Sequence, residues 1–223
     1  MLVSDAPNIG TGLLLVHAVI SRGLQVATEH AQGFAQRGWP DASTQEGFLN
    51  YAGTFVVVLD THHLVEEELA FPRLRDRFPE APFDLLLAQH RDIVAALLEV
   101  QSALADVAGG APQDRALSEL SEALRRVDPL WHPHRQLEEE LFTEEKMQTR
   151  LGAEEQAELM QLIAAYDQEH ATPDYLVVPF MLYNLPPAER ALFARELPPF
   201  VTEQLVPLIW RPKWASMAPF LLT

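Results

Sequence analysis

Apolar residues recur three and four positions apart through most of this 223-residue chain, a spacing that places them on one face of an α-helix. The same segments are rich in alanine, leucine, glutamate, glutamine and arginine, which favour helices. No segment sustains the two-residue alternation of a half-buried strand, and the β-branched run at 55–59 continues directly into an acidic helical pattern. The spacing therefore predicts an all-α fold.

Glycine, proline and capping residues divide the first two thirds of the chain into four long helices. The expected helices cover residues 8–36, 43–72, 82–107 and 112–150. Ser43 is a candidate N-cap for the second helix, with Glu46 three residues later. Pro129 and Pro133 lie inside the fourth helix and should bend it.

The composition changes after Gly152. Residues 159–223 hold nine of the 17 prolines and two of the four tryptophans. We expect one further helix at 153–168, followed by shorter helices that break at the prolines. The sequence thus predicts a helical domain over residues 1–151 and a helical, proline-rich extension over residues 152–223 that packs on it.

Composition and charge exclude several classes of protein. The chain has no cysteine, which rules out disulfides, thiolate zinc sites, iron–sulfur clusters and a catalytic thiol. It also lacks the GxSxG motif of serine hydrolases. The net charge of −16 argues against nucleic acid and anionic membranes as partners, although most of this acidity fits solvated helix faces. The N-terminal residues lack the pattern of a signal peptide, so we expect a cytoplasmic protein without a membrane span.

The histidines are the most informative polar residues. One histidine lies at the centre of the apolar stripe of each long helix, at His17, His62, His90 and His134. Glu66 and Glu138 follow two of them by one turn, on the same face. By contrast, His30 and His132 fall off the stripes, and His63 lies at the edge of one. The pattern therefore does not arise merely from an abundance of histidine.

Buried carboxylates among leucines need a compensating cation, because an unpaired buried charge is very costly. Imidazole and carboxylate together suit iron, and the HxxxE spacing lets both groups bind one ion or bridge two. A single core histidine is usually a packing residue, but four central histidines with two matched glutamates predict a metal site. The other glutamates of the two EEE runs are expected on solvated faces: Glu67, Glu68, Glu139 and Glu140.

The segments HHLVEEELAFP and HRQLEEELF resemble the hemerythrin-like (HHE cation-binding) family, whose signature is H…HxxxE…H…HxxxE. The resemblance covers residues 8–150, and the segment from Pro179 onwards is similar to a Pro/Trp-rich C-terminal extension found in a subset of the family. It implies an up-and-down four-helix bundle around two carboxylate-bridged iron ions. The ligands that it implies, with both glutamates as bridges, are His17, His62, Glu66, His90, His134 and Glu138.

The chain departs from the family pattern at one position. Many members carry a second histidine one turn after the third-helix ligand, where this chain has Val94. His63 could supply the missing donor through a modest rotation of its helix, and we include it among the expected metal ligands; the alternative is a surface role. Without it, one iron would keep an open or water-filled position, which favours reactivity over simple carriage.

Three functions remain open at this point. The first is a non-haem di-iron protein that binds or senses oxygen or iron. The second is an oxidoreductase that acts on peroxide or nitric oxide at the same centre, and the third is an interaction module with a structural metal. The expected partner is therefore a small diatomic or peroxide ligand, and no protein partner or role for His170 emerges. A ferritin-like oxidase is less well supported, because no ExxH pair precedes the central histidines.

Overall fold

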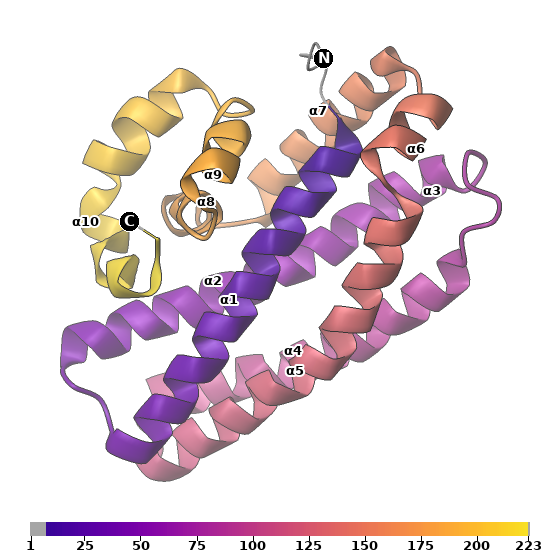
Figure 1. Cartoon of the computed structure of the whole chain (residues 1–223). Coiled ribbons are helices and arrows are strands. Elements are labelled where there is room, and N and C mark those ends of the chain that lie inside the picture. Colours follow the sequence, from indigo (N-terminus) through magenta and orange to yellow (C-terminus); the bar gives the residue numbers. More distant parts are fainter. Residues whose placement is uncertain (1–7, 223) are drawn as a thin grey trace.

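The computed structural model describes residues 8–222, and all of its regular elements in that range are helices (Figure 1). Residues 1–7, which carry part of the expectation that the chain begins without a signal peptide, lie outside the described range, as does residue 223. The α-helices are α1 (Ile9–Arg37), α2 (Ala42–Val65), α3 (Phe71–Leu74), α4 (Phe83–Ala108), α5 (Gln113–Leu141), α6 (Glu144–Arg150), α7 (Ala153–His170), α8 (Asp174–Tyr183), α9 (Pro187–Ala194) and α10 (Arg211–Trp214). Two π-helical segments, η1 (Glu66–Ala70) and η2 (Val201–Ile209), and a 3₁₀ segment, η3 (Ala215–Phe220), complete the chain.

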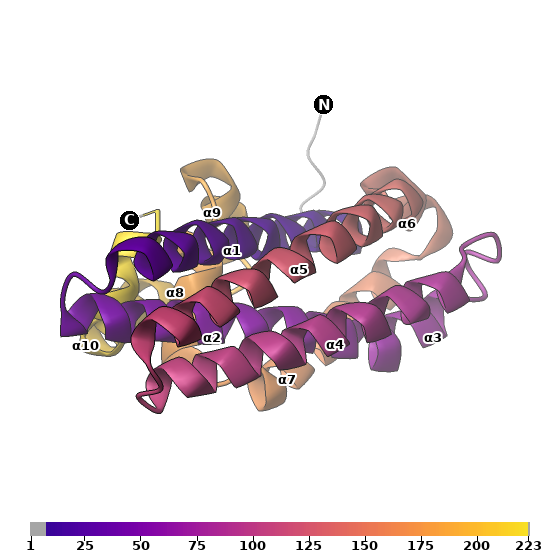
Figure 2. The same ribbon diagram turned by 90° about the horizontal axis from the view of Figure 1, so that it is seen from below.

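Helices α1, α2, α4 and α5 lie side by side and alternate in direction along the chain (Figures 1 and 2). Each packs against its neighbours in sequence, and α5 returns to pack against α1, which closes the bundle. The predicted all-α fold with a four-helix bundle is confirmed. By length and composition α1 is apolar enough to cross a membrane, but buried core helices share this property, and α1 packs within the bundle.

The second helix begins earlier than predicted. Asp41, not Ser43, is the N-cap of α2, because its carboxylate accepts a hydrogen bond from the backbone N–H of Thr44 at 2.7 Å. At its other end the helix does not run regularly to residue 72. It widens into η1, where the N–H of Phe71 donates to the carbonyl of Glu66, five residues earlier, and then continues as α3.

The predicted fourth helix is two helices. Pro129 and Pro133 stay within α5, but α5 ends at Leu141 and α6 begins at Glu144. Phe142 is the C-cap of the first helix and Thr143 is the N-cap of the second, since the hydroxyl oxygen of Thr143 accepts a hydrogen bond from the backbone N–H of Lys146. The buried ring of Phe142 holds this break against the bundle.

The polar residues of the stripes divide the hydrophobic core into two clusters. Trp131 of α5 belongs to the larger cluster and Phe142, the C-cap of α5, to the smaller one, with His134 and Glu138 between them along the chain. The larger cluster also contains buried residues of α8, η2 and η3. The bundle therefore has a polar layer between two apolar ones.

The C-terminal segments pack on α1 and α2 (Figure 1). Segment η3 approaches α2 so closely that a Cβ atom on Gly47 would lie 1.9 Å from the backbone oxygen of Ser216. The guanidinium of Arg22 donates hydrogen bonds to Asn184 Oδ1 at 2.6 Å and to the carbonyl of Phe220 at 3.0 Å. These contacts join the C-terminal segments to the bundle through both close packing and partly buried hydrogen bonds.

Candidate metal centre

Four helices and one π-helical turn bring the predicted site residues to one place in the bundle. Helices α1, α2 and α4 provide His17, His62 and His90, and α5 provides His134 and Glu138. Glu66 is the first residue of η1. All six side chains are buried. The face of each helix that sequence periodicity indicated is the face that meets here.

One group of donor atoms joins α1, α2 and α5. The Nε2 atoms of His17 and His62 lie 3.2 Å apart. His17 Nε2 is 3.3 Å from Glu138 Oε2, and His62 Nε2 is 3.5 Å from Glu66 Oε2. The ligand atoms of these four residues all lie within 4.8 Å of one another.

A second group joins α4 and α5 through the same two carboxylates. His90 Nε2 lies 3.4 Å from Glu66 Oε2 and 3.9 Å from Glu138 Oε1, and His134 Nε2 lies 3.3 Å from Glu138 Oε2. These four donors also lie within 4.8 Å of one another. The two groups therefore overlap at both glutamates and differ in their histidine pairs.

The spacing of the donors fits metal coordination. Bonds of about 2.1 Å to one ion place two ligands about 3.0 Å apart at a right angle and about 3.4 Å apart at a tetrahedral angle. Most of the contacts between donor atoms in the cluster, both histidine–glutamate and histidine–histidine, fall in or near this interval, at 3.2–3.5 Å. Several of the buried atoms, among them Glu138 Oε1 and Oε2, His90 Nε2 and His134 Nε2, have no hydrogen-bond partner among the described residues. A cation between them would satisfy these atoms together.

The outer ring nitrogens are held by polar side chains of neighbouring helices. His17 Nδ1 donates to Glu139 Oε1 at 3.2 Å, and His90 Nδ1 donates to Glu67 Oε1 at 2.9 Å. With Nδ1 held by these contacts, each ring in its neutral form would present the lone pair of Nε2 to a metal ion, which is the arrangement that metal-binding histidines adopt.

Glu67 is exposed, as predicted, with 37% of its side chain accessible, whereas the prediction of a solvated face for Glu139 is wrong, because its side chain is only 24% exposed. Their carboxylates reach back across the bundle to histidines of other helices, and Arg135 holds Glu139 in place through a contact of 2.8 Å. The sequence carried a signal for them, because each directly follows the buried glutamate in one of the two matching EEE runs. Glu68 and Glu140 are exposed, as predicted.

Another orienting contact was absent from the sequence analysis. His134 Nδ1 donates to the amide oxygen of Gln89 at 3.2 Å. Gln89 directly precedes His90, but nothing in the local pattern of α4 indicates that it would meet a histidine of α5.

Without a metal ion, two histidines and one glutamate of the cluster bind protons more tightly than usual. Burial opposes the charge on His17, but contacts with Glu138 and Glu139 outweigh it and raise the pKa of His17 to about 9. Burial likewise opposes the charge on His90, yet Glu138 and Glu66 raise its pKa to about 10. Burial and the neighbouring Glu138 raise the pKa of Glu66 to about 8. These protons compensate the buried carboxylates, so a bound cation would have to displace them.

Two aromatic rings enclose the cluster. The indole of Trp131 lies edge-on to the ring of His17, with centroids 5.2 Å apart, and its Nε1–H donates to Ser21 Oγ at 3.0 Å. On the other side Phe71 stacks on His90 with centroids 5.5 Å apart. The widened turn of η1, between Glu66 and Phe71, separates the carboxylate from this ring along the chain.

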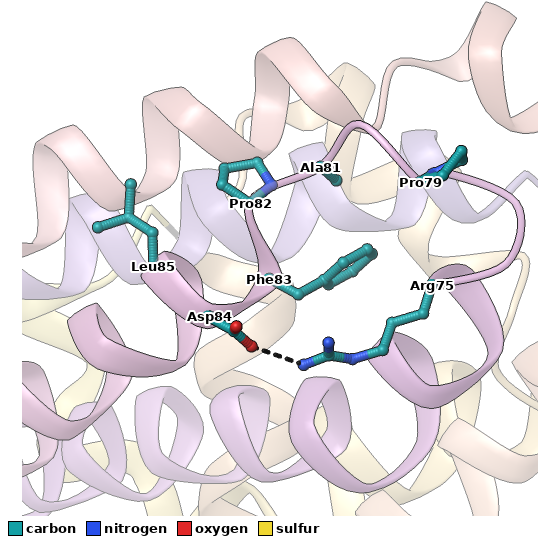
Figure 3. A pocket seen from close by; sticks show the side chains of 7 residues that line it. All are labelled: Arg75, Pro79, Ala81, Pro82, Phe83, Asp84 and Leu85. Atoms are coloured by element: carbon teal, nitrogen blue, oxygen red, sulfur yellow. Dashed lines mark hydrogen bonds and ion pairs between the residues drawn. The ribbon is translucent and has the colours of Figure 1, made fainter.

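A surface pocket lies at the connection between α3 and α4 (Figure 3). Arg75 and Asp84 form an ion pair at 3.3 Å beside it, and the ring of Phe83 lines it. None of the residues that line this pocket belongs to the buried cluster. The pocket and the cluster are therefore separate features.

The helical bundle with imidazole and carboxylate donors in its core places this chain in the class of cation-binding helical bundles. A family model described as the hemerythrin HHE cation-binding domain matches residues 13–142, which is more than half of the chain. The chain belongs to this family. No curated protein and no solved structure matches it.

Proposed function

We propose that the bundle holds two iron ions bridged by Glu66 and Glu138, and that the protein binds or senses oxygen at this centre. The observation that carries the proposal is the overlap of the two donor groups. Each group has its own pair of histidines, whereas the two carboxylates are common to both. One ion would use only part of this set, while two ions would use each donor.

The chemistry of the donors favours iron. The centre offers imidazole nitrogens and carboxylate oxygens without thiolate, a set that suits iron and gives soft metals little advantage. Iron supplies reversible electron transfer and oxygen chemistry that the side chains lack. The side chains keep the ligand nitrogens oriented through their outer hydrogen bonds and exclude water from the centre.

The surroundings of the centre select for ligand size. Trp131 and Phe71 lie against its histidines, and apolar clusters lie on both sides along the bundle. A site enclosed in this way favours oxygen and other molecules of a few atoms over larger substrates.

The proposal is tested by metal analysis of protein from iron-replete cells, followed by optical spectroscopy. We expect about two irons per chain. Anaerobically reduced protein should develop a new absorption band with oxygen that disappears when oxygen is removed. One zinc per chain without iron would contradict the di-iron centre. Catalytic consumption of peroxide or nitric oxide, without a reversible oxygen adduct, would instead identify an oxidoreductase.

A further inference from the structure

His63 lies inside the bundle rather than at its surface. Its side chain is 1% exposed, and neither ring nitrogen has a hydrogen-bond partner among the described residues. The ring stacks on His90 with centroids 4.1 Å apart and an interplanar angle of 18°. It also meets the ring of His134 edge-on, at 5.3 Å. A buried imidazole with both nitrogens unpaired calls for an explanation.

The position of His63 beside two other histidines explains its unpaired ring nitrogens. A ring nitrogen of His63 lies within 4.8 Å of ligand nitrogens of both His90 and His134. These are the two histidines of the second donor group. Helix α4 itself offers no further donor there, since the residue one turn after His90 is Val94.

We propose that His63 is a ligand of the ion held by His90 and His134, and that α2 thereby replaces a donor that α4 lacks. The inference rests on the proposed metal centre and specifies its ligand set. This ion would have three imidazoles, whereas the ion at His17 and His62 would have two. The two ions would therefore be chemically different.

The geometry requires a movement that side chains can supply. With bonds of about 2.1 Å, two ligands lie about 4.2 Å apart on opposite sides of one ion and about 3.0 Å apart at a right angle. The donors of His63, His90 and His134 lie within 4.8 Å of one another, so they must approach by at most about 0.6 Å for an opposite pair and about 1.8 Å for a pair at a right angle. Rotation of side-chain torsions supplies movements of this size without a change of the backbone.

The competing explanation is that His63 is a packing ring for His90. His63→Phe separates the two roles, because phenylalanine keeps a flat ring that can stack but has no nitrogen. The control is His30→Phe, since His30 contacts Phe34 and Phe220 and belongs to none of the donor groups. Both variants should be compared with the wild type by circular dichroism to establish that they fold.

The measurement is titration of metal-free protein with cobalt(II), followed by its visible absorption, and with iron(II), followed by metal analysis. If His63 is a ligand, His63→Phe should bind the second equivalent at least about 10-fold more weakly and show a changed cobalt spectrum, whereas His30→Phe should match the wild type. In His63→Ala, added imidazole should restore the wild-type spectrum by entering the space of the missing ring.

Unchanged affinity and spectrum in His63→Phe would overturn the proposal. So would a change that imidazole fails to reverse in His63→Ala, because it would assign the ring to packing. Both outcomes leave the proposed di-iron function intact as long as the wild type binds two ions. A wild type that binds fewer than two ions would instead contradict the proposed function itself.

Discussion

The two HxxxE segments have the same spacing but different surroundings. In the α5 segment, His134 and Glu138 lie on a regular helix, whereas in the other segment the helix widens into η1 at Glu66. Both pairs nevertheless reach the same cluster. The four-residue spacing therefore determines the shared face of each pair, and the backbone beyond the glutamate is free to differ.

The residue directly after each histidine shows the sharper contrast. His63 follows His62 and is buried, while Arg135 follows His134 and is 34% exposed on its side chain. Arg135 donates to Glu139 at 2.8 Å and to Ser21 Oγ at 2.9 Å, so it stabilises the outer contacts of the centre. The residue directly after the motif histidine is thus a buried imidazole at the cluster on α2, whereas on α5 it is an arginine that pairs with Glu139 outside the cluster. Position in a motif does not by itself determine the role of a residue.

The largest expected effect comes from removing a shared carboxylate. Glu138→Ala should weaken metal binding by more than about 100-fold, because Glu138 lies within reach of histidines of both donor groups. Removing a proposed ligand should reduce metal affinity more than removing a residue that only orients a ligand, which typically costs about 10–100-fold. Glu66→Ala should act in the same direction. The matched controls are Glu140→Ala and Glu68→Ala, which alter exposed members of the same runs. Metal analysis of the four variants makes the comparison, and equal losses in a variant and its control would contradict the assigned helix faces.

Removal of the outer carboxylates should have an intermediate effect. Glu139→Ala should lower metal affinity by about 10–100-fold, because the ring of His17 loses the acceptor that orients it. Glu67→Ala should lie at the lower end of that range, since the Glu67 side chain is 37% exposed and that of Glu139 only 24%. Competition with a chromophoric chelator measures both affinities. Wild-type affinity in both variants would show that these contacts do not orient the ligands.

The smallest effect is expected at Arg135. Arg135→Gln removes the cation that holds Glu139 but leaves the carboxylate itself, so we expect a decrease in affinity of less than about 10-fold. Arg115→Gln is the control on the same helix, because Arg115 forms an ion pair with Glu119 on the exposed face of α5, away from the centre. The same chelator competition applies, with Glu139→Ala as the reference. A loss at Arg135 larger than that of Glu139→Ala would mean that Arg135 acts through more than Glu139.

Much of the centre was accessible from local spacing. The 100° advance per residue identified the inward faces of His17, His62, His90 and His134, and the cost of burying a carboxylate indicated a cation beside Glu66 and Glu138. Apolar periodicity and helix-breaking residues predicted the four long helices of the bundle, and most of the predicted helix ends lie within a few residues of the observed ones. Each of these inferences depends on residues that are close in the sequence.

The tertiary structure decided what depends on contacts between distant segments. The pairs His17–Glu139 and His90–Glu67 join different helices, so no periodicity within one helix could reveal them. The burial of His63 likewise depends on the rotation of α2 against α4, because a residue at the edge of a stripe faces the core or solvent according to small changes in helix packing. The sequence by itself determined which helix faces turn inward, through local geometry and the cost of desolvation. Only the packing of the helices decided which further side chains meet there, because that depends on atoms brought together from separate parts of the chain.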